Sequence, residues 1–303
     1  MPLSQEYTDF FNSYQSYNDI IKVWHRGFDN QNKAWIRDQL MPVLIPKLNL
    51  EDRDLHELKV LSVGSGNGSF DLLLIDAILK EIKSQYPGTT MSWTVVEPNS
   101  VSVQEFQRKA QSTEDYCGNV KFVWETAMFQ DFVARQQGIE EPQKYHLITF
   151  INSLYYVDER LALRQSYNLL LEDQGVVLTV KEEENSTTQK AFRMYVQLMG
   201  QTSRGLTPTN EILTELQKEL GIAYDRFTAP LNVEITEIFQ DDNPVGGALI
   251  KFLLHSNEDP RKSKEGVKVL EFLKSECRST CDAKGEHLCI AKKQEVTLIM
   301  KAL

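Results

Sequence analysis

Glycine recurs at every second position after an apolar run near residue 60, a spacing that suits contact between a ligand and the backbone. Gly64, Gly66 and Gly68 follow the run at 60–63 and precede a long helical pattern. Glycine leaves room for a ligand and permits the positive φ of a tight turn. The free N–H groups at a helix N-terminus favour negative ligand groups. The stretch therefore predicts a strand–loop–helix unit that binds a ligand.

A carboxylate follows the next apolar run. Glu97 comes directly after 93–96 and before Pro98, where a carboxylate can accept two hydrogen bonds from a ribose diol. Loop and acid together leave two cofactor classes, a nicotinamide or flavin dinucleotide and S-adenosylmethionine. A dinucleotide site expects its third glycine at the position of Ser69 and its acid about 20 residues further on. Here the glycine comes one residue earlier and the acid later, which favours S-adenosylmethionine.

The elements that would position these residues alternate between strand and helix from residue 58 to 181. Such a rhythm predicts a parallel sheet with helices on both faces. Strand patterns occupy 58–63, 93–97, 120–124, 145–151 and 176–181, and helix patterns occupy 70–82, 102–111, 129–137 and 158–171. Open α/β sheets bind ligands at the carboxyl ends of their strands. The glycine loop, Glu97 and the stretch 151–156 are therefore expected to meet there.

The segments on either side of this core are less regular. Aromatic and aliphatic residues at spacings of three and four predict amphipathic helices between 7 and 24 and between 35 and 45, either as core packing or as a lid. Helix patterns also run through 189–199, from Thr207-Pro208 to Gly221, and through 248–254 and 263–277. Alternating runs at 231–235 and 296–300 predict a sheet finished by an antiparallel hairpin. The acidic run at 182–184 is interpreted as a solvated face, with contact to a larger cation as the alternative.

The composition narrows the class of protein. The chain has 303 residues, 41% of them hydrophobic, which is enough for a sizeable core. A formal net charge of −10 argues against binding to nucleic acid. No membrane partner is expected because no run of eighteen apolar residues occurs. The N-terminus lacks the pattern of a signal peptide, and the four cysteines lack zinc-ligand spacing, so we expect a cytoplasmic protein with free thiols.

Several motifs together resemble the histamine N-methyltransferase family of class I S-adenosylmethionine-dependent methyltransferases. They are the stretch 61–68 with Asp71-Leu72 after it, Tyr86-Pro87-Gly88, 95–98, 119–124 and 154–157. Ser62 adds to the resemblance, because most class I methyltransferases carry an acid at that place. The resemblance is clearest from about 58 to 180 and thinner at both ends.

The resemblance implies an α/β fold of the class I methyltransferase (Rossmann-like) type. Its mostly parallel seven-stranded sheet would have helices on both faces, an antiparallel C-terminal strand, and helical elements at both ends that cover the substrate. Residues 1–57 would form an N-terminal helical lid, 58–185 the Rossmann-like core, and 186–303 the part that completes the sheet and the substrate pocket in one compact unit.

The resemblance also implies which residues hold S-adenosyl-L-methionine, the methyl donor. The loop residues Gly64, Ser65, Gly66 and Gly68 would contact it, Glu97 would bind its ribose beside Pro98, and Ile151 would pack against its adenine or methionine part. The family has a glutamine after the acid, and here Ser102 takes that place. A serine near the adenine corresponds to the stretch 126–128, which makes Thr126 and Ala127 candidates.

On the acceptor side, the family holds its substrate's ammonium with an acid in the N-terminal region, and Asp29 falls at that place. A helix N-cap is the alternative role for Asp29. Asn152 would approach the acceptor, and Gln294 would match a C-terminal asparagine, with Lys293 or Glu295 in its place if the register shifts. Tyr14 or Tyr17, Tyr155 and Tyr156 would supply aromatic walls. The family's tryptophans after the fifth strand are absent, since 189–200 contains only Phe192 and Tyr195 as aromatics.

The implied activity is methyl transfer to nitrogen of a small cationic amine, preferably one that bears an imidazole. A neutral imidazole nitrogen needs no strong base, so no catalytic side chain and no metal are expected, and Asn152 and Gln294 would only orient the acceptor. Two alternatives stay open. One is a methyltransferase for carnosine or another small amine or dipeptide, and the other is a non-catalytic S-adenosylmethionine-binding protein. We expect a monomer with a small-molecule amine substrate.

Overall fold

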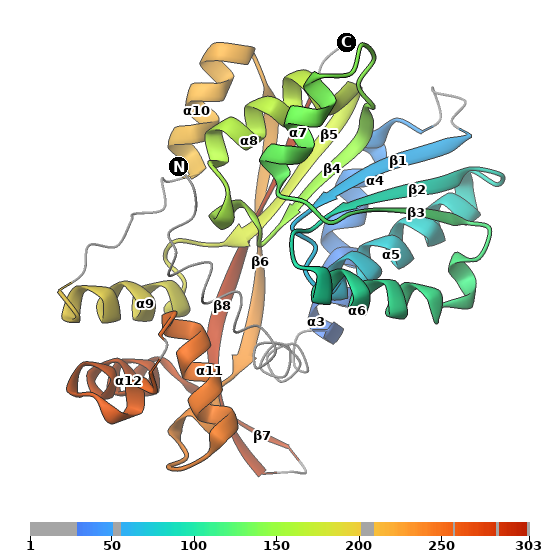
Figure 1. The fold of residues 1–303 in the computed structure, drawn as a ribbon. Helices are drawn as coiled ribbons and strands as arrows, with labels where there is room; N and C mark the ends of the chain where they lie inside the picture. Colours follow the sequence, from blue (N-terminus) through green and yellow to red (C-terminus); the bar gives the residue numbers. More distant parts are fainter. Residues whose placement is uncertain (1–28, 51–55, 201–208, 257, 283–284, 302–303) are drawn as a thin grey trace. The chain divides into compact units, whose positions relative to one another are not determined.

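The computed structural model describes residues 29–50, 56–200, 209–256, 258–282 and 285–301 (Figure 1). The chain divides into two compact units. A core unit comprises 32–181, 207–227 and 295–303, and a second unit comprises 1–31, 182–206 and 228–294. The helix expected between 7 and 24, with Tyr14 and Tyr17, lies outside the described residues. No helix in the described ranges is long and apolar enough to cross a membrane.

The sheet has the parallel centre that the sequence predicts. Its strands are β1 (Glu57–Val63), β2 (Thr90–Val96), β3 (Val120–Glu125), β4 (Tyr145–Ile151), β5 (Leu171–Glu182), β6 (Ala223–Glu234), β7 (Arg278–Asp282) and β8 (Gly285–Met300). Their order is β3-β2-β1-β4-β5-β8-β6, with β7 paired to β8. All neighbours from β3 to β5 run parallel. Since β1 lies between β2 and β4, the loops that follow these three strands emerge at the same edge.

The C-terminal strand is antiparallel to β5, as expected. The N–H of Glu183 donates to the carbonyl of Lys293, and the N–H of Lys301 donates to the carbonyl of Gly175. Residue numbers thus rise along one strand as they fall along the other. One strand was not predicted. β7 pairs antiparallel with β8, with Arg278 opposite Cys289, and makes the sheet eight-stranded instead of seven-stranded. Its residues, Arg-Ser-Thr-Cys-Asp, lack the alternating apolar pattern by which a strand is recognised.

Helices cover both faces of the core sheet (Figure 1). They are α3 (Asp29–Trp35), α4 (Met41–Leu48), α5 (Ser69–Gln85), α6 (Ser100–Gln111), α7 (Phe129–Gln137), α8 (Glu159–Gln165) and α10 (Thr209–Leu220). On one face α7, α8 and α10 share a buried cluster with β1 and β4 that includes Phe132, Leu163 and Leu213. On the other, Phe106 of α6 packs edge-on against Trp124 of β3. Burial on both faces explains the nearly continuous apolar strands.

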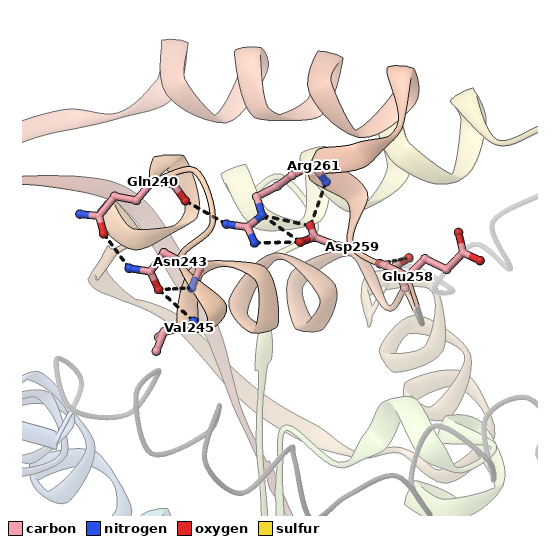
Figure 2. Close-up of polar contacts among 8 residues, drawn as sticks. Gln240, Asn243, Val245, Glu258, Asp259 and Arg261 are labelled. Atoms are coloured by element: carbon pink, nitrogen blue, oxygen red, sulfur yellow. Dashed lines mark hydrogen bonds and ion pairs between the residues drawn. The ribbon is translucent and has the colours of Figure 1, made fainter.

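The second unit contains α9 (Thr187–Leu198), α11 (Pro244–Leu254) and α12 (Lys264–Glu276). Figure 2 shows the polar contacts that fix its turns. The Arg261 guanidinium donates to the Asp259 carboxylate at 2.8 Å and to the carbonyl of Gln240 at 3.0 Å. The Asn243 side chain accepts from the N–H of Val245 at 2.9 Å and so caps α11. These contacts join residues of the turns to one another, so we assign them a structural role.

Candidate active site

The glycine loop after β1 uses its three glycines for different purposes. All three have positive φ, +69° at Gly64, +54° at Gly66 and +72° at Gly68. A Cβ on Gly64 would lie 2.5 Å from Cβ of Ser153, and one on Gly68 would lie 2.2 Å from the ring of Phe106. A Cβ on Gly66 would meet nothing within 4 Å. The loop therefore packs tightly at its two ends and is open at its centre, where a ligand can approach the backbone.

Glu97 is tied to the centre of this loop. One carboxylate oxygen accepts from the N–H of Gly66 at 2.9 Å, and the other accepts from the N–H of Asn99 at 2.9 Å. The side chain is buried, and burial raises its pKa even though both N–H bonds act to lower it. Each carboxylate oxygen keeps a free acceptor position. The acid can thus accept ribose hydroxyls while the loop holds it in place, so these residues fit the cofactor.

The other candidate cofactor residues lie in the core unit, after β2 and β3, at the end of β4 or at the start of α6. Pro98 is exposed after Glu97, and Ile151 is buried at the end of β4. Ser102 is fully buried at the start of α6, and its hydroxyl has no hydrogen-bond partner among the described residues. Thr126 is exposed and Ala127 half-buried, directly after β3. An unpaired buried hydroxyl is costly, which makes Ser102 a position where a ligand's polar atom would be stabilising.

The segment after β4 carries three candidate acceptor residues. Asn152 adopts a left-handed φ of +51° and donates its N–H to the carbonyl of Val180 at 2.7 Å. Asparagine is among the few residues that tolerate this conformation. The rings of Tyr155 and Tyr156 stand edge to face with centroids 6.3 Å apart. Both are half-buried, so neither is the core residue that a packing role would require.

Asp29 and Gln294, the remaining acceptor candidates, belong to the second unit. Asp29 is the first residue of α3. Gln294 lies in β8, only 4% exposed, and its side-chain oxygen has no hydrogen-bond partner in the described parts of the chain. Of the two register alternatives, Lys293 is exposed and Glu295 is paired with Arg226. Gln294 and Glu295 each keep one buried oxygen without a partner among the described residues, but only Gln294 lacks a charged partner on its other atoms.

Two buried acids were not anticipated. Asp71 in the first turn of α5 is 2% exposed, and burial raises its pKa to about 6. Glu159 at the start of α8 receives two hydrogen bonds from Lys181, at 3.0 and 2.8 Å. The acidic run after β5 is also not wholly solvated, because the Glu182 side chain is 11% exposed and lies 3.6 Å from Lys292. In the described ranges, no group of three or more His, Cys, Asp and Glu is arranged to hold a metal.

No protein-family model matches the chain, but curated relatives do. Histamine N-methyltransferase of Bos taurus is 25% identical over 79% of this chain and 81% of its own length. That of Cavia porcellus is 29% identical over 71% of each. Carnosine N-methyltransferase 2 of Gallus gallus is 24% identical over 82% of this chain and 72% of its own.

Solved structures resemble the chain at a lower level. The YcgJ protein of Bacillus subtilis gives a TM-score of 0.44 at 16% identity and covers 86% of this chain and 99% of its own. The plantazolicin methyltransferase BpumL, solved in complex with SAH, gives a TM-score of 0.44 at 12% identity and covers 96% and 91%.

The strand order, the glycine loop and the hydrogen bond from this loop to Glu97 together define a class I methyltransferase fold that uses S-adenosylmethionine. The curated relatives confirm the resemblance drawn from the sequence motifs. The chain is a distant relative of the histamine N-methyltransferases and of carnosine N-methyltransferase 2, and is an S-adenosylmethionine-dependent N-methyltransferase.

Proposed function

We propose that the chain methylates a nitrogen of a small cationic amine, with an imidazole-bearing acceptor such as histamine preferred. The observation that carries this proposal is the junction of two loops in the core unit. The Ser153 hydroxyl donates to the carbonyl of Val63 at 2.6 Å and ties the segment after β4 to the glycine loop. This bond supports a role for Asn152, Tyr155 and Tyr156 near the cofactor, because they flank Ser153 in the sequence.

The main task of the protein in this reaction is to orient the acceptor nitrogen toward the methyl group. When bound, the cofactor supplies an electrophilic methyl group. A neutral imidazole nitrogen already has the lone pair it needs, so a side chain that aims this lone pair contributes more than a base would. The Asn152 amide can hydrogen-bond such a ring. The half-buried faces of Tyr155 and Tyr156 suit a cation, a contact that contributes roughly 0.5–2 kcal/mol.

Asp29 and Gln294 remain acceptor residues that the family resemblance implies. A carboxylate at Asp29 would hold the ammonium of the amine. Gln294 would orient the acceptor, and its buried, unpaired oxygen supports this role because a donor from a bound ligand would satisfy it. We place the reaction in the cytoplasm and assign it to a monomer.

The test is an activity screen of the purified protein with labelled S-adenosylmethionine, read by product mass spectrometry. The panel contains histamine, carnosine, histidine and other biogenic amines. Methylation of an imidazole nitrogen supports the proposal, and a panel without product overturns it. Calorimetry with S-adenosylhomocysteine, run in parallel, separates a non-catalytic binding protein, which binds the cofactor product but methylates nothing.

A second candidate acceptor is carnosine or another dipeptide. The family's tryptophans after β5 are missing, and a buried charge pair, Glu182 with Lys292, lies in the unit that contains Gln294. A charged pair beside the acceptor would suit one with more polar groups than histamine has. A higher kcat/KM for carnosine than for histamine would favour this candidate, and the reverse ratio would reject it.

A further inference from the structure

A buried acid lies directly beneath the glycine loop and is linked to it by two serines. Asp71 accepts a hydrogen bond from the hydroxyl of Ser62 and one from Nε1 of Trp93 at 3.3 Å. The hydroxyl of Ser62 is in turn 2.8 Å from the hydroxyl of Ser65. Asp71 and Ser62 are buried, whereas Ser65 is half-buried in the loop. The three side chains form a continuous line from the interior to the face of the loop.

The number of hydrogens in this chain of hydrogen bonds decides which group donates and which accepts in each bond. An ionised carboxylate only accepts hydrogen bonds, and a hydroxyl has a single hydrogen to donate. Ser62 must therefore donate to Asp71, and Ser65 must donate to Ser62. The Ser65 oxygen then has no hydrogen left for a ligand and presents only lone pairs. The side chain of this loop residue is held as an acceptor, and the negative charge of Asp71 strengthens it.

We propose that the Ser65 oxygen accepts a hydrogen bond from the α-ammonium of S-adenosylmethionine and that Asp71 is the positioning residue for this contact. The assignment rests on the cofactor part of the proposed function and is independent of the acceptor. Among the cofactor's polar groups, the α-ammonium is the one that combines N–H donors with a positive charge. Ribose hydroxyls are neutral and already have Glu97 as an acceptor beside Gly66.

The surroundings of Asp71 determine when the line works in this direction. Burial raises the pKa of Asp71 to about 6, and the charge of Glu97, which follows β2, adds to the rise. The neighbours from β1 and β2 that touch it, Ser62 and Trp93, carry no charge. Lys109 of α6 donates to the loop at the carbonyl of Asn67, at 3.0 Å. A protonated Asp71 can donate to Ser62 and reverse the line, so the contact is expected to weaken below about pH 6.

The experiment compares two ligands by calorimetry on the full chain. S-adenosylhomocysteine retains the α-ammonium, and 5′-methylthioadenosine lacks the whole amino-acid part. Ser65→Ala should weaken S-adenosylhomocysteine about tenfold, the size of one charge-assisted hydrogen bond, and change 5′-methylthioadenosine less than twofold. Asp71→Asn should lower the same affinity several-fold and reduce its pH dependence between 5 and 7, because the amide cannot ionise, while any part due to Glu97 remains.

Ser69→Ala is the matched control, because its hydroxyl bonds within the same loop to Asn67 and takes no part in the line to Asp71. This variant should leave the ratio of the two affinities within twofold of the wild type. Equal losses for both ligands in Ser65→Ala, or no loss, would overturn the proposal. Failure of the wild type to bind S-adenosylhomocysteine would overturn it together with the cofactor assignment. If the acceptor screen gives no product but Ser65→Ala still changes the ratio of the two ligand affinities, only the proposed acceptor would be rejected.

Discussion

At the scale of single residues, a substitution at Gly66 is expected to affect folding stability and ligand affinity by different amounts. Its φ of +54° costs a non-glycine residue roughly 1–2 kcal/mol, but an added Cβ there meets nothing within 4 Å. We expect Gly66→Ala to lower the free energy of unfolding by about 1–2 kcal/mol and to weaken S-adenosylhomocysteine more than tenfold, because the methyl group projects where the ligand approaches. Urea unfolding and calorimetry measure the two effects.

Gly118→Ala is the matched control for that variant. Gly118 has a φ of +73° and equally open surroundings, and it precedes β3 at the amino end of the strand. The same loss of stability with unchanged affinity is expected. Equal affinities for Gly66→Ala and Gly118→Ala would contradict a ligand site over Gly66.

Asp71 makes stability depend on pH with a definite sign. Its pKa is about 6 in the folded chain, against an ordinary value of 3.8 for an aspartate, so the folded state binds more protons between these values. The free energy of unfolding should therefore fall as pH rises from about 4 to 6, by up to about 3 kcal/mol. Asp71→Asn should be more stable than the wild type at pH 7.5 and show a flatter profile by urea unfolding across this range.

Glu97 acts in the same direction, because burial raises its pKa as well. Part of the slope should thus survive in Asp71→Asn and disappear only when Glu97→Gln is added. A profile for Asp71→Asn that matches the wild type would show that the carboxylate is not buried in its charged form.

The residues of the cofactor site differ in how readily a sequence reveals them. The glycine loop and Glu97 could be predicted because each follows its own strand, and parallel strands bring their carboxyl ends together. Asp71 could not, since an acid in a first helical turn is ordinarily an exposed partner of the helix dipole. Only packing against Trp93 shows that this one points inward. Ser153 was missed for the same reason, because its bond to Val63 spans ninety positions of sequence.

At the scale of elements, several strands were predicted shorter than they are because polar residues interrupt their apolar pattern. The run at 296–300 marks only the end of β8, because Lys292 and Gln294 interrupt the apolar alternation while lying 9% and 4% exposed. Periodicity records polarity, not burial, so buried polar positions are read as loop. β7 was missed for another reason, since Arg278, Ser279 and Thr280 are polar and exposed. The helices were predicted well, since capping residues such as Asn99 and Ser263 mark their starts.

The junction of α8 with β5 depends on a buried ion pair. Lys181 and Glu159 have side chains 6% and 12% exposed. Glu159→Gln leaves the Lys181 charge buried with a weaker partner, and we expect a loss of about 3 kcal/mol in urea unfolding. Replacing both, as Lys181→Met with Glu159→Leu, should restore most of the loss. A double variant no more stable than the single one would contradict this account.

At the scale of the whole molecule, cofactor binding and acceptor use should respond to different variants. Gln294→Ala in the second unit is expected to lower kcat/KM for the acceptor about tenfold, the size of one or two hydrogen bonds, with S-adenosylhomocysteine affinity unchanged. Steady-state kinetics on the best acceptor and calorimetry measure the two quantities. Lys293→Ala, at the exposed neighbour, is the control and should change neither by more than twofold.

The hydrogen bond between the Ser153 hydroxyl and the carbonyl of Val63 has a thermodynamic consequence. It joins the loop that suits the cofactor to the segment that carries Asn152, Tyr155 and Tyr156, and a Cβ on Gly64 would already collide with Ser153. A ligand that orders one segment therefore shifts the other. Such coupling is reciprocal, so the factor by which the cofactor improves amine binding must equal the factor by which the amine improves cofactor binding. The two substrates should bind cooperatively, and Ser153→Ala should uncouple them.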